Sequence, residues 1–166
     1  AFILAARFKR PWPIIWGILV ATLANHALAG ALGTFLPELF TPNTLAWILG
    51  VGFLLMAGWM LIPDSFDEDE AKLMRFGVFA TTLITFFIAE MGDKTQVATV
   101  ALAAQYQSFV AVVLGTTLGM MIANVPAVIL GDRIAGVIPV RLVHGIAALI
   151  FAVLGVLSLG RALALW

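Results

Sequence analysis

The chain has 166 residues, of which 63% are hydrophobic and 11% charged, and nine Lys and Arg balance nine Asp and Glu. Soluble domains average roughly 45–50% apolar and about 25% charged residues, so this composition excludes an ordinary cytosolic enzyme and a disordered chain. The zero net charge provides no field to attract a nucleic acid, and the lack of cysteine excludes disulfides and thiol chemistry. With a mean hydropathy of +1.10, the composition predicts an all-α polytopic membrane protein.

Crossing a bilayer takes about 20 mostly apolar residues, and the long uncharged runs of the chain predict five full membrane spans. In chain order we expect these spans at about 12–33, 44–62, 76–103, 109–130 and 143–163. Charged residues interrupt the third span, and a polar cluster separates it from the fourth. The first six residues are apolar but too few to cross a bilayer, so we expect them to end a helix that begins further upstream.

Basic residues lie in alternate loops, and this pattern predicts the orientation. Lys and Arg occur before the first span, at 72–75 and at 133–141, whereas the loops at 37–43 and 105–108 contain none. Because basic loops remain in the cytoplasm, the three basic loops are expected inside. The chain shows no organellar targeting segment, so we expect a multi-pass protein of the bacterial inner membrane.

An internal repeat with an offset of about 98 residues is predicted. It aligns Gly17 with Gly115 and, with one residue of slack, Asn25 with Asn124. Each unit has three helices, an odd number, so the two units are inverted in the membrane, as in many secondary transporters. The boundaries follow from the spans and the loop between the units. We expect a first repeat at 1–63 that lacks most of its first helix, an acidic cytoplasmic loop at 64–75 and a second repeat at 76–166.

The interruption of the third span is the most informative segment. Glu90, Asp93 and Lys94 lie well inside an apolar run. A charge at mid-bilayer costs roughly 2.5–3.5 kcal/mol, and such groups persist when they pair, face water or bind an ion. Glu90 and Asp93 are three positions apart, so a helix would place both carboxylates on one face, which suits a divalent cation. The alternative is an ion pair at a helix end, against which the flanking apolar residues argue.

Neighbouring residues are candidates to complete the site. Thr95 and Gln96 can add neutral oxygens, and Gly92 can let the helix loosen and free carbonyl oxygens. Lys94 can neutralise one carboxylate when no ion is bound.

Two asparagines at mid-helix, Asn25 and Asn124, are repeat mates and candidates for further neutral ligands. The alternative is that each hydrogen-bonds a neighbouring helix, a packing role worth about 0.6 kcal/mol. His26 follows Asn25 and could relay protons or touch the ion, but a helix-packing role is favoured.

The residues at 90–95, E-M-G-D-K-T, match the E-x-G-D-(K/R)-(T/S) signature of a family of membrane cation transporters. The chain thus resembles bacterial manganese exporters and the calcium/manganese–proton exchangers of the eukaryotic Golgi, over nearly all of its length. The family carries the signature twice, and the resemblance implies that both copies build one ion site. This chain holds one copy, so the resemblance implies that an upstream copy or a second protomer, as in a homodimer, supplies the rest.

These features predict a secondary active transporter that exports Mn²⁺, or Ca²⁺, in exchange for protons. The ion is the transported substrate, and we expect no resident cofactor, no enzymatic activity and no nucleic-acid partner. Glu90 and Asp93 would bind either the ion or protons, and this mutual exclusion would couple the two fluxes. Two alternatives remain open: a non-transporting membrane subunit whose charges are docking pairs, and an exporter of small organic cations or amino acids.

Overall fold

The computed structural model describes residues 10–62, 77–130 and 140–164, and within these ranges every regular element is an α-helix. The six helices are α2 (Pro11–Leu39), α3 (Pro42–Met60), α4 (Gly77–Glu90), α5 (Lys94–Tyr106), α6 (Phe109–Leu130) and α7 (Val140–Ala162). Four of them, α2, α3, α6 and α7, are long and apolar enough to cross a membrane. The expected all-α polytopic class is therefore confirmed.

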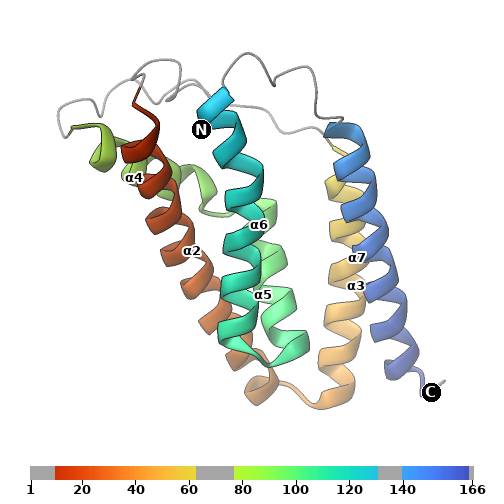
Figure 1. Ribbon diagram of the computed structural model, residues 1–166. Coiled ribbons are helices and arrows are strands. Elements are labelled where there is room, and N and C mark those ends of the chain that lie inside the picture. The colour runs from red at the N-terminus through yellow and green to blue at the C-terminus, as the bar shows by residue number, and fades with distance from the viewer. Residues whose placement is uncertain (1–9, 63–76, 131–139, 165–166) are drawn as a thin grey trace.

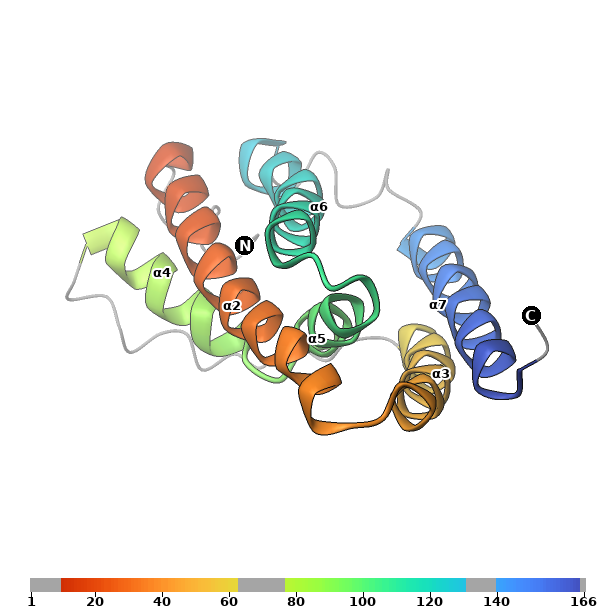
Figure 2. The same ribbon diagram turned by 90° about the horizontal axis from the view of Figure 1, so that it is seen from below.

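The span expected at 76–103 consists of two shorter helices that differ in direction (Figure 2). α4 ends at Glu90 and α5 begins at Lys94, and we call the three residues between them, 91–93, the break. Gly92 in the break has a φ of +78°, in the left-handed region that favours glycine. The sequence predicted an interruption by charges, whereas the structure shows that the helix itself ends there.

The first span is longer than expected, because α2 continues to Leu39 instead of ending near residue 33. The next helix begins where a cap is available: Oγ1 of Thr41 accepts a hydrogen bond from the backbone N–H of Thr44 at 3.3 Å, and Pro42 occupies the first turn. The expected polar turn before the fourth span is confirmed, since α5 ends at Tyr106 and Gln107 adopts a left-handed φ of 50°.

α2 lies at the centre of the larger part of the molecule and packs against α4, α5 and α6. Glycines allow these close approaches. A Cβ added at Gly17 would lie 2.8 Å from Cβ of Thr82 in α4, and one at Gly33 would collide with the Val100 carbonyl of α5. Gly30 likewise lies directly against α6. The positions of three helices around the break thus depend on small residues along α2.

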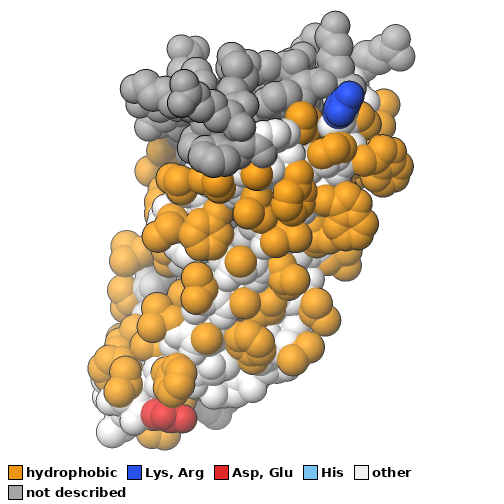
Figure 3. Space-filling view, turned by 90° about the vertical axis from the view of Figure 1, so that its left-hand side faces the viewer, with side chains coloured by type: hydrophobic (Ala, Val, Ile, Leu, Met, Phe, Trp, Pro, Cys, Tyr) orange, Lys and Arg blue, Asp and Glu red, His pale blue; other side chains and the backbone are white. Residues whose placement is uncertain are grey.

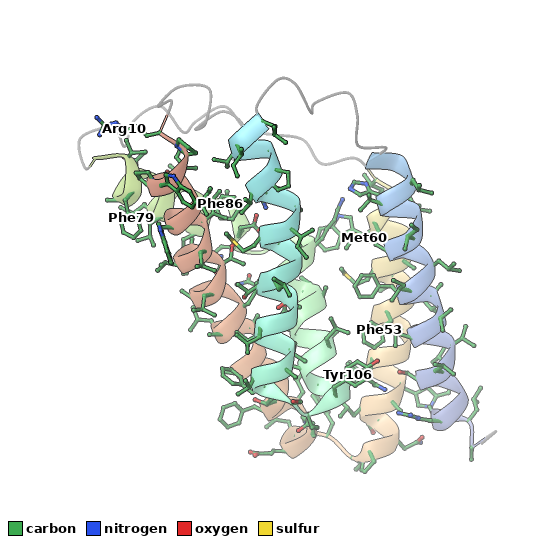
Figure 4. All side chains as sticks on the ribbon, viewed as in Figure 1. Arg10, Phe53, Met60, Phe79, Phe86 and Tyr106 are labelled. Atoms are coloured by element: carbon green, nitrogen blue, oxygen red, sulfur yellow. The ribbon has the colours of Figure 1, made fainter. Side chains whose placement is uncertain are left out.

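α3 and α7 form a separate pair beside this group (Figures 1 and 2), and we call it the α3–α7 pair. The ring of Phe53 stacks on that of Phe151 with 5.9 Å between centroids, and Figure 4 shows Phe53 within the pair. Gly155 brings α7 against the Leu54 side chain of α3. The pair meets the rest of the molecule mainly through contacts of α3 with α5.

The helix ends alternate between two sides of the molecule, as the loop charges predict. The start of α2, the end of α3 and the start of α4 lie at one end, together with the end of α6 and the start of α7 (Figure 1). The two connections without Lys or Arg lie at the opposite end. Hydrophobic side chains cover most of the face in Figure 3 between charged groups near its two ends, as expected of a surface in lipid. The acidic loop predicted at 64–75 lies outside the described residues.

The helices that correspond in the two predicted repeats, α2 with α6 and α3 with α7, pack against each other. Their environments nevertheless differ. Half of the apolar window of α2 is buried, compared with 17% in α6. Gly17 lies against α4, whereas a Cβ on its mate Gly115 would meet no described atom within 4 Å. The division into units at 1–63 and 76–166 stays a prediction.

Candidate functional site

Two carboxylates meet at one hydroxyl beside the break. Oγ1 of Thr95 lies 3.0 Å from Oε2 of Glu90 and 3.1 Å from Oδ2 of Asp93. Glu90 is the last residue of α4, Asp93 precedes α5, and Thr95 is in the first turn of α5. A hydroxyl carries a single hydrogen, so Thr95 can donate to only one carboxylate at a time. Three oxygens from both arms of the break therefore converge on one place.

The local backbone explains why both acids face the start of α5. Asp93 has an extended conformation, and its carbonyl accepts hydrogen bonds from the N–H groups of Gln96 and Val97 at 3.0 and 3.2 Å. The first N–H groups of a helix lack intrahelical partners and carry partial positive charge, which favours carboxylates nearby. The spacing of Glu90 and Asp93 predicted that one helix presents both carboxylates on one face. The helix instead ends at Glu90, but the two side chains still meet at Thr95.

The break leaves a backbone carbonyl of α4 without its helical partner. In an unbroken helix the N–H of Met91 would donate to the carbonyl of Phe87, but here it donates to Ile88 at 3.2 Å. Nδ2 of Asn25, from α2, donates to the Phe87 carbonyl instead, at 2.9 Å. Asn25 is fully buried, and an unsatisfied carbonyl in this place would be unfavourable. Asn25 thus stabilises the end of α4.

The side chain of Gln96 extends the same network to the other arm of the break. Its Nε2 donates to Oδ1 of Asn25 at 3.2 Å, and its Oε1 accepts from the backbone N–H of Gly92 at 2.6 Å. One amide pair therefore links α2, α4, the break and α5. The predicted neutral oxygens of Gln96 and Asn25 lie in this network, and Gln96 follows the carboxylate-bearing Asp93 closely in the chain.

Lys94 extends away from the break toward the end of α3. Its Nζ donates to the carbonyl of Ile62 at 2.7 Å and lies 5.8 Å from the centre of the Trp59 ring. The residue is 4% exposed. The sequence predicted that this ammonium neutralises a carboxylate, and the geometry adds a contact with another helix.

Asn124 is the predicted site residue that the structure does not connect to the break. Its Nδ2 donates to the carbonyl of Met120 in its own helix, α6, at 3.0 Å. This is a packing contact within one helix. The structure therefore brings most of the predicted set together at or next to the break, and the members of this group are Glu90, Gly92, Asp93, Lys94, Thr95, Gln96 and Asn25. A ligand role for any of them, or for Asn124, stays a prediction.

A buried polar patch lies beside this network on α2. Nδ1 of His26 lies 3.5 Å from Oγ1 of Thr117 in α6, while Nε2 of His26 and Oγ1 of Thr22 have no hydrogen-bond partner among the described residues. Buried polar atoms are bonded in the great majority of cases. The contact with α6 agrees with a packing role for His26 and does not test proton relay.

Sequence reasoning missed three contributors to the site: the carbonyls of Phe87 and Ile62, and the ring of Trp59. Every residue has a carbonyl, so no residue type marks one that is left free. The available signal was indirect, since a glycine beside mid-span charges indicates a helix end, and helix ends leave carbonyls free.

The group at the break can offer a cation two negative charges and neutral oxygens. All of these donors are hard oxygen atoms, which suit Ca²⁺, Mn²⁺ and Mg²⁺ better than soft metals. Among the described residues no cluster contains three or more His, Cys, Asp or Glu side chains. The two carboxylates and Thr95 are the charged and hydroxyl oxygens that the break can offer to a cation.

Comparison with known proteins gives a consistent result. The family model described as "Divalent cation/proton antiporter GDT1" matches residues 1–68 and 78–165. A protein of Vibrio cholerae serotype O1 named "Putative manganese exporter" is 48% identical over 152 residues, which are 91% of this chain and 76% of that protein. A GDT1-like protein of Synechocystis is 32% identical over 95% of this chain and 85% of its own length. GDT1-like protein 3 of Oryza sativa subsp. indica is 31% identical, with coverages of 90% and 64%. No solved structure matches the chain significantly.

Proposed function

Because this chain belongs to the GDT1 family of divalent cation/proton antiporters, we propose that it exports Mn²⁺ from the cytoplasm in exchange for protons at Glu90 and Asp93. The observation that carries the proposal is the pair of carboxylate oxygens at 3.0 and 3.1 Å from one hydroxyl. Both carboxylates contact this hydroxyl, so a cation or protons bound at this place neutralise their charge.

The coupling follows from the shared carboxylates. A divalent cation and protons neutralise the same two groups, so one excludes the other. The exchange then requires that the site open to each side of the membrane in turn. Thr95 contributes a third oxygen to the ion, and the amide oxygens of Gln96 and Asn25 supply neutral dipoles beside it.

The protein is a multi-pass protein of the bacterial inner membrane, in agreement with its family, its apolar helices and its bacterial relative. The name of the Vibrio cholerae relative favours Mn²⁺, and Ca²⁺ is the second candidate because it accepts the same oxygen ligands. We propose that further ligands for the ion come from a second copy of the E-x-G-D-(K/R)-(T/S) signature. That copy would belong to an upstream segment or to a second copy of the chain.

The test is uptake into sealed vesicles with the purified protein, in which internal Mn²⁺ and internal pH are recorded together. A Glu90→Gln plus Asp93→Asn double variant is expected to abolish both signals while the folded fraction stays that of the parent. Glu38→Gln is the matched control, since Glu38 is an exposed residue near the end of α2 and is expected to leave flux unchanged.

Four outcomes would overturn the proposal. Parental flux in the double variant would exclude Glu90 and Asp93 as the site of exchange. The absence of flux in the folded parent would favour the non-transporting subunit whose charges are docking pairs. Movement of Mn²⁺ without a pH change would remove the proton exchange. Uptake of an organic amine in place of Mn²⁺ would favour the exporter of small organic cations.

A further inference from the structure

The end of α3 is a place where a cation is favoured. The last carbonyls of a helix have no intrahelical partner and carry the negative end of the helix dipole. The final turn of α3 tightens, because the N–H of Leu61 donates to the carbonyl of Gly58 and the N–H of Ile62 donates to the carbonyl of Trp59. The carbonyl of Ile62 projects beyond this turn and accepts from Nζ of Lys94 at 2.7 Å.

A second contact holds the same ammonium. Nζ of Lys94 lies 5.8 Å from the ring centre of Trp59, within the range of a cation–π interaction. With Lys94 only 4% exposed, the ammonium depends on protein partners for the solvation it has lost. A charge-assisted hydrogen bond to Ile62, just beyond α3, and the aromatic face of Trp59 in its last turn are such partners.

The position of Lys94 in the chain makes this contact consequential. Lys94 is the first residue of α5 and follows Asp93 directly, so the bond to α3 begins one residue from a carboxylate of the site. On the other side, Asn25 of α2 is bonded to Gln96 and to the end of α4. The break is thus held from two sides, by α2 through an amide pair and by α3 through an ammonium.

We propose that Lys94 is a positioning residue that fastens the break to the end of α3, so that the α3–α7 pair moves together with the carboxylates during transport. The transport part of this proposal rests on the proposed function. α3 and α7 pack closely on each other and meet the rest mainly through α5, which itself packs on α2, so a displacement at the start of α5 can be passed to the α3–α7 pair. Lys94 then transmits a rearrangement at Asp93 to that pair.

A role for Lys94 purely as counter-charge to Glu90 and Asp93 makes a different prediction. Removing a positive charge beside the carboxylates would change their affinity for a cation, and therefore KM, while Trp59 would be irrelevant. A positioning role predicts that changes at Lys94 and at Trp59 act alike, with a lower kcat and little change in KM.

The first experiment measures Mn²⁺ flux for Lys94→Gln, Trp59→Leu and the double variant. We expect each single change to lower kcat about tenfold with KM within about twofold, and the double variant to be no slower than the slower single variant. Lys94→Arg, which keeps a charged donor and stacks on aromatic rings, is expected to retain most of the rate. Trp47→Leu, near the other end of α3, is the matched control and is expected to transport as the parent does. The proposal would be overturned if Lys94→Gln changed KM strongly while Trp59→Leu kept the kcat and KM of the parent.

The second experiment does not depend on transport. The chain contains no cysteine, so spin labels can be attached at Leu55→Cys on α3 and Val97→Cys on α5, two exposed positions. Pulsed electron paramagnetic resonance then reports the distance distribution between the helices. We expect Lys94→Gln and Trp59→Leu to broaden or shift it, and Trp47→Leu to leave it as in the parent. An unchanged distribution in Lys94→Gln would overturn the inference. If Lys94→Gln changes the distribution but the parent moves no Mn²⁺, the positioning contact of Lys94 is supported and the proposed function is excluded.

Discussion

Gln96 donates its side-chain amide to Oδ1 of Asn25 at 3.2 Å, across 71 positions of the sequence. The other end of the Asn25 side chain donates to the Phe87 carbonyl. One buried residue of α2 therefore holds both arms of a broken helix. The relative position of the two carboxylates at the break depends on α2, although neither carboxylate belongs to it.

Replacement of Asn25 by Val tests this dependence. The change removes both hydrogen bonds and leaves the Phe87 carbonyl buried without a partner, so we expect a loss of about 1–3 kcal/mol of stability. We also expect a higher KM for Mn²⁺, because the arms of the break are no longer held. Thermal unfolding in detergent and flux kinetics measure the two effects. Asn124→Val is the matched control at the repeat mate, whose side-chain amide bonds within α6, and its effect should be smaller. Equal effects of the two variants would contradict the role assigned to Asn25.

The hydroxyl between the carboxylates is tested by Thr95→Val, which keeps the shape of the side chain and replaces the hydroxyl with a methyl group. The change removes the hydroxyl that Glu90 and Asp93 share, and the ion loses an oxygen ligand. We expect a KM for Mn²⁺ raised about tenfold, equivalent to about 1.4 kcal/mol. Thr95→Ser should stay close to the parent. Thr116→Val, which removes a hydroxyl bonded within its own helix, serves as the control. A parental KM in Thr95→Val would exclude the hydroxyl from the site.

The backbone of the break is tested at Gly92. Its φ of +78° is unfavourable for a residue with a Cβ by roughly 1–2 kcal/mol, and a Cβ there would meet no described atom within 4 Å. Gly92→Ala is therefore expected to destabilise the break through backbone strain alone and to slow transport. Gly92→Asn should be milder, because Asn tolerates the left-handed region better. Gly52→Ala is the control, since Gly52 lies inside α3 with open space at its Cβ and should be neutral or stabilising. If Gly92→Ala had the unfolding temperature and flux of the parent, the left-handed turn would not matter.

The packing of α2 on α4 is tested by a pair of equal changes at Gly17 and Gly115. A Cβ at Gly17 would lie 2.8 Å from Cβ of Thr82, so Gly17→Ala is expected to push α4 away and lower the unfolding temperature. Gly115→Ala meets no described atom within 4 Å and is expected to be neutral or slightly stabilising, because Ala favours helix. A strong loss of stability in Gly115→Ala would show that α6 carries a packing partner outside the described residues.

Local features of the sequence predicted much of the architecture. Hydropathy is a property of contiguous residues, so it located the long spans, and α6 begins and ends where the apolar run does. The polar cluster before α6 and the alternation of basic loops were predictable for the same reason. The position of the acidic cluster was predictable because charges in an apolar run are expensive, so Glu90 and Asp93 stand out from the residues on either side.

The two predicted asparagine ligands show where such reasoning stops. Asn25 and Asn124 have equivalent places in the predicted repeat, yet Asn25 contacts the break and Asn124 bonds within its own helix. Their difference comes from neighbours: α2 is packed against both arms of the broken span, and the described surroundings of α6 are more open. Equivalence along the chain does not determine which helix covers a side chain.

The sequence by itself determined the membrane class, the approximate spans and the acidic motif, because each depends on residues close together in the chain. Only the tertiary structure decided which carbonyls the break sets free, and which side chains reach them. Lys94 binds a carbonyl 32 positions away, and Asn25 binds one 62 positions away. Such partners are chosen by the packing of helices whose apolar faces are chemically alike, so no local pattern specifies them.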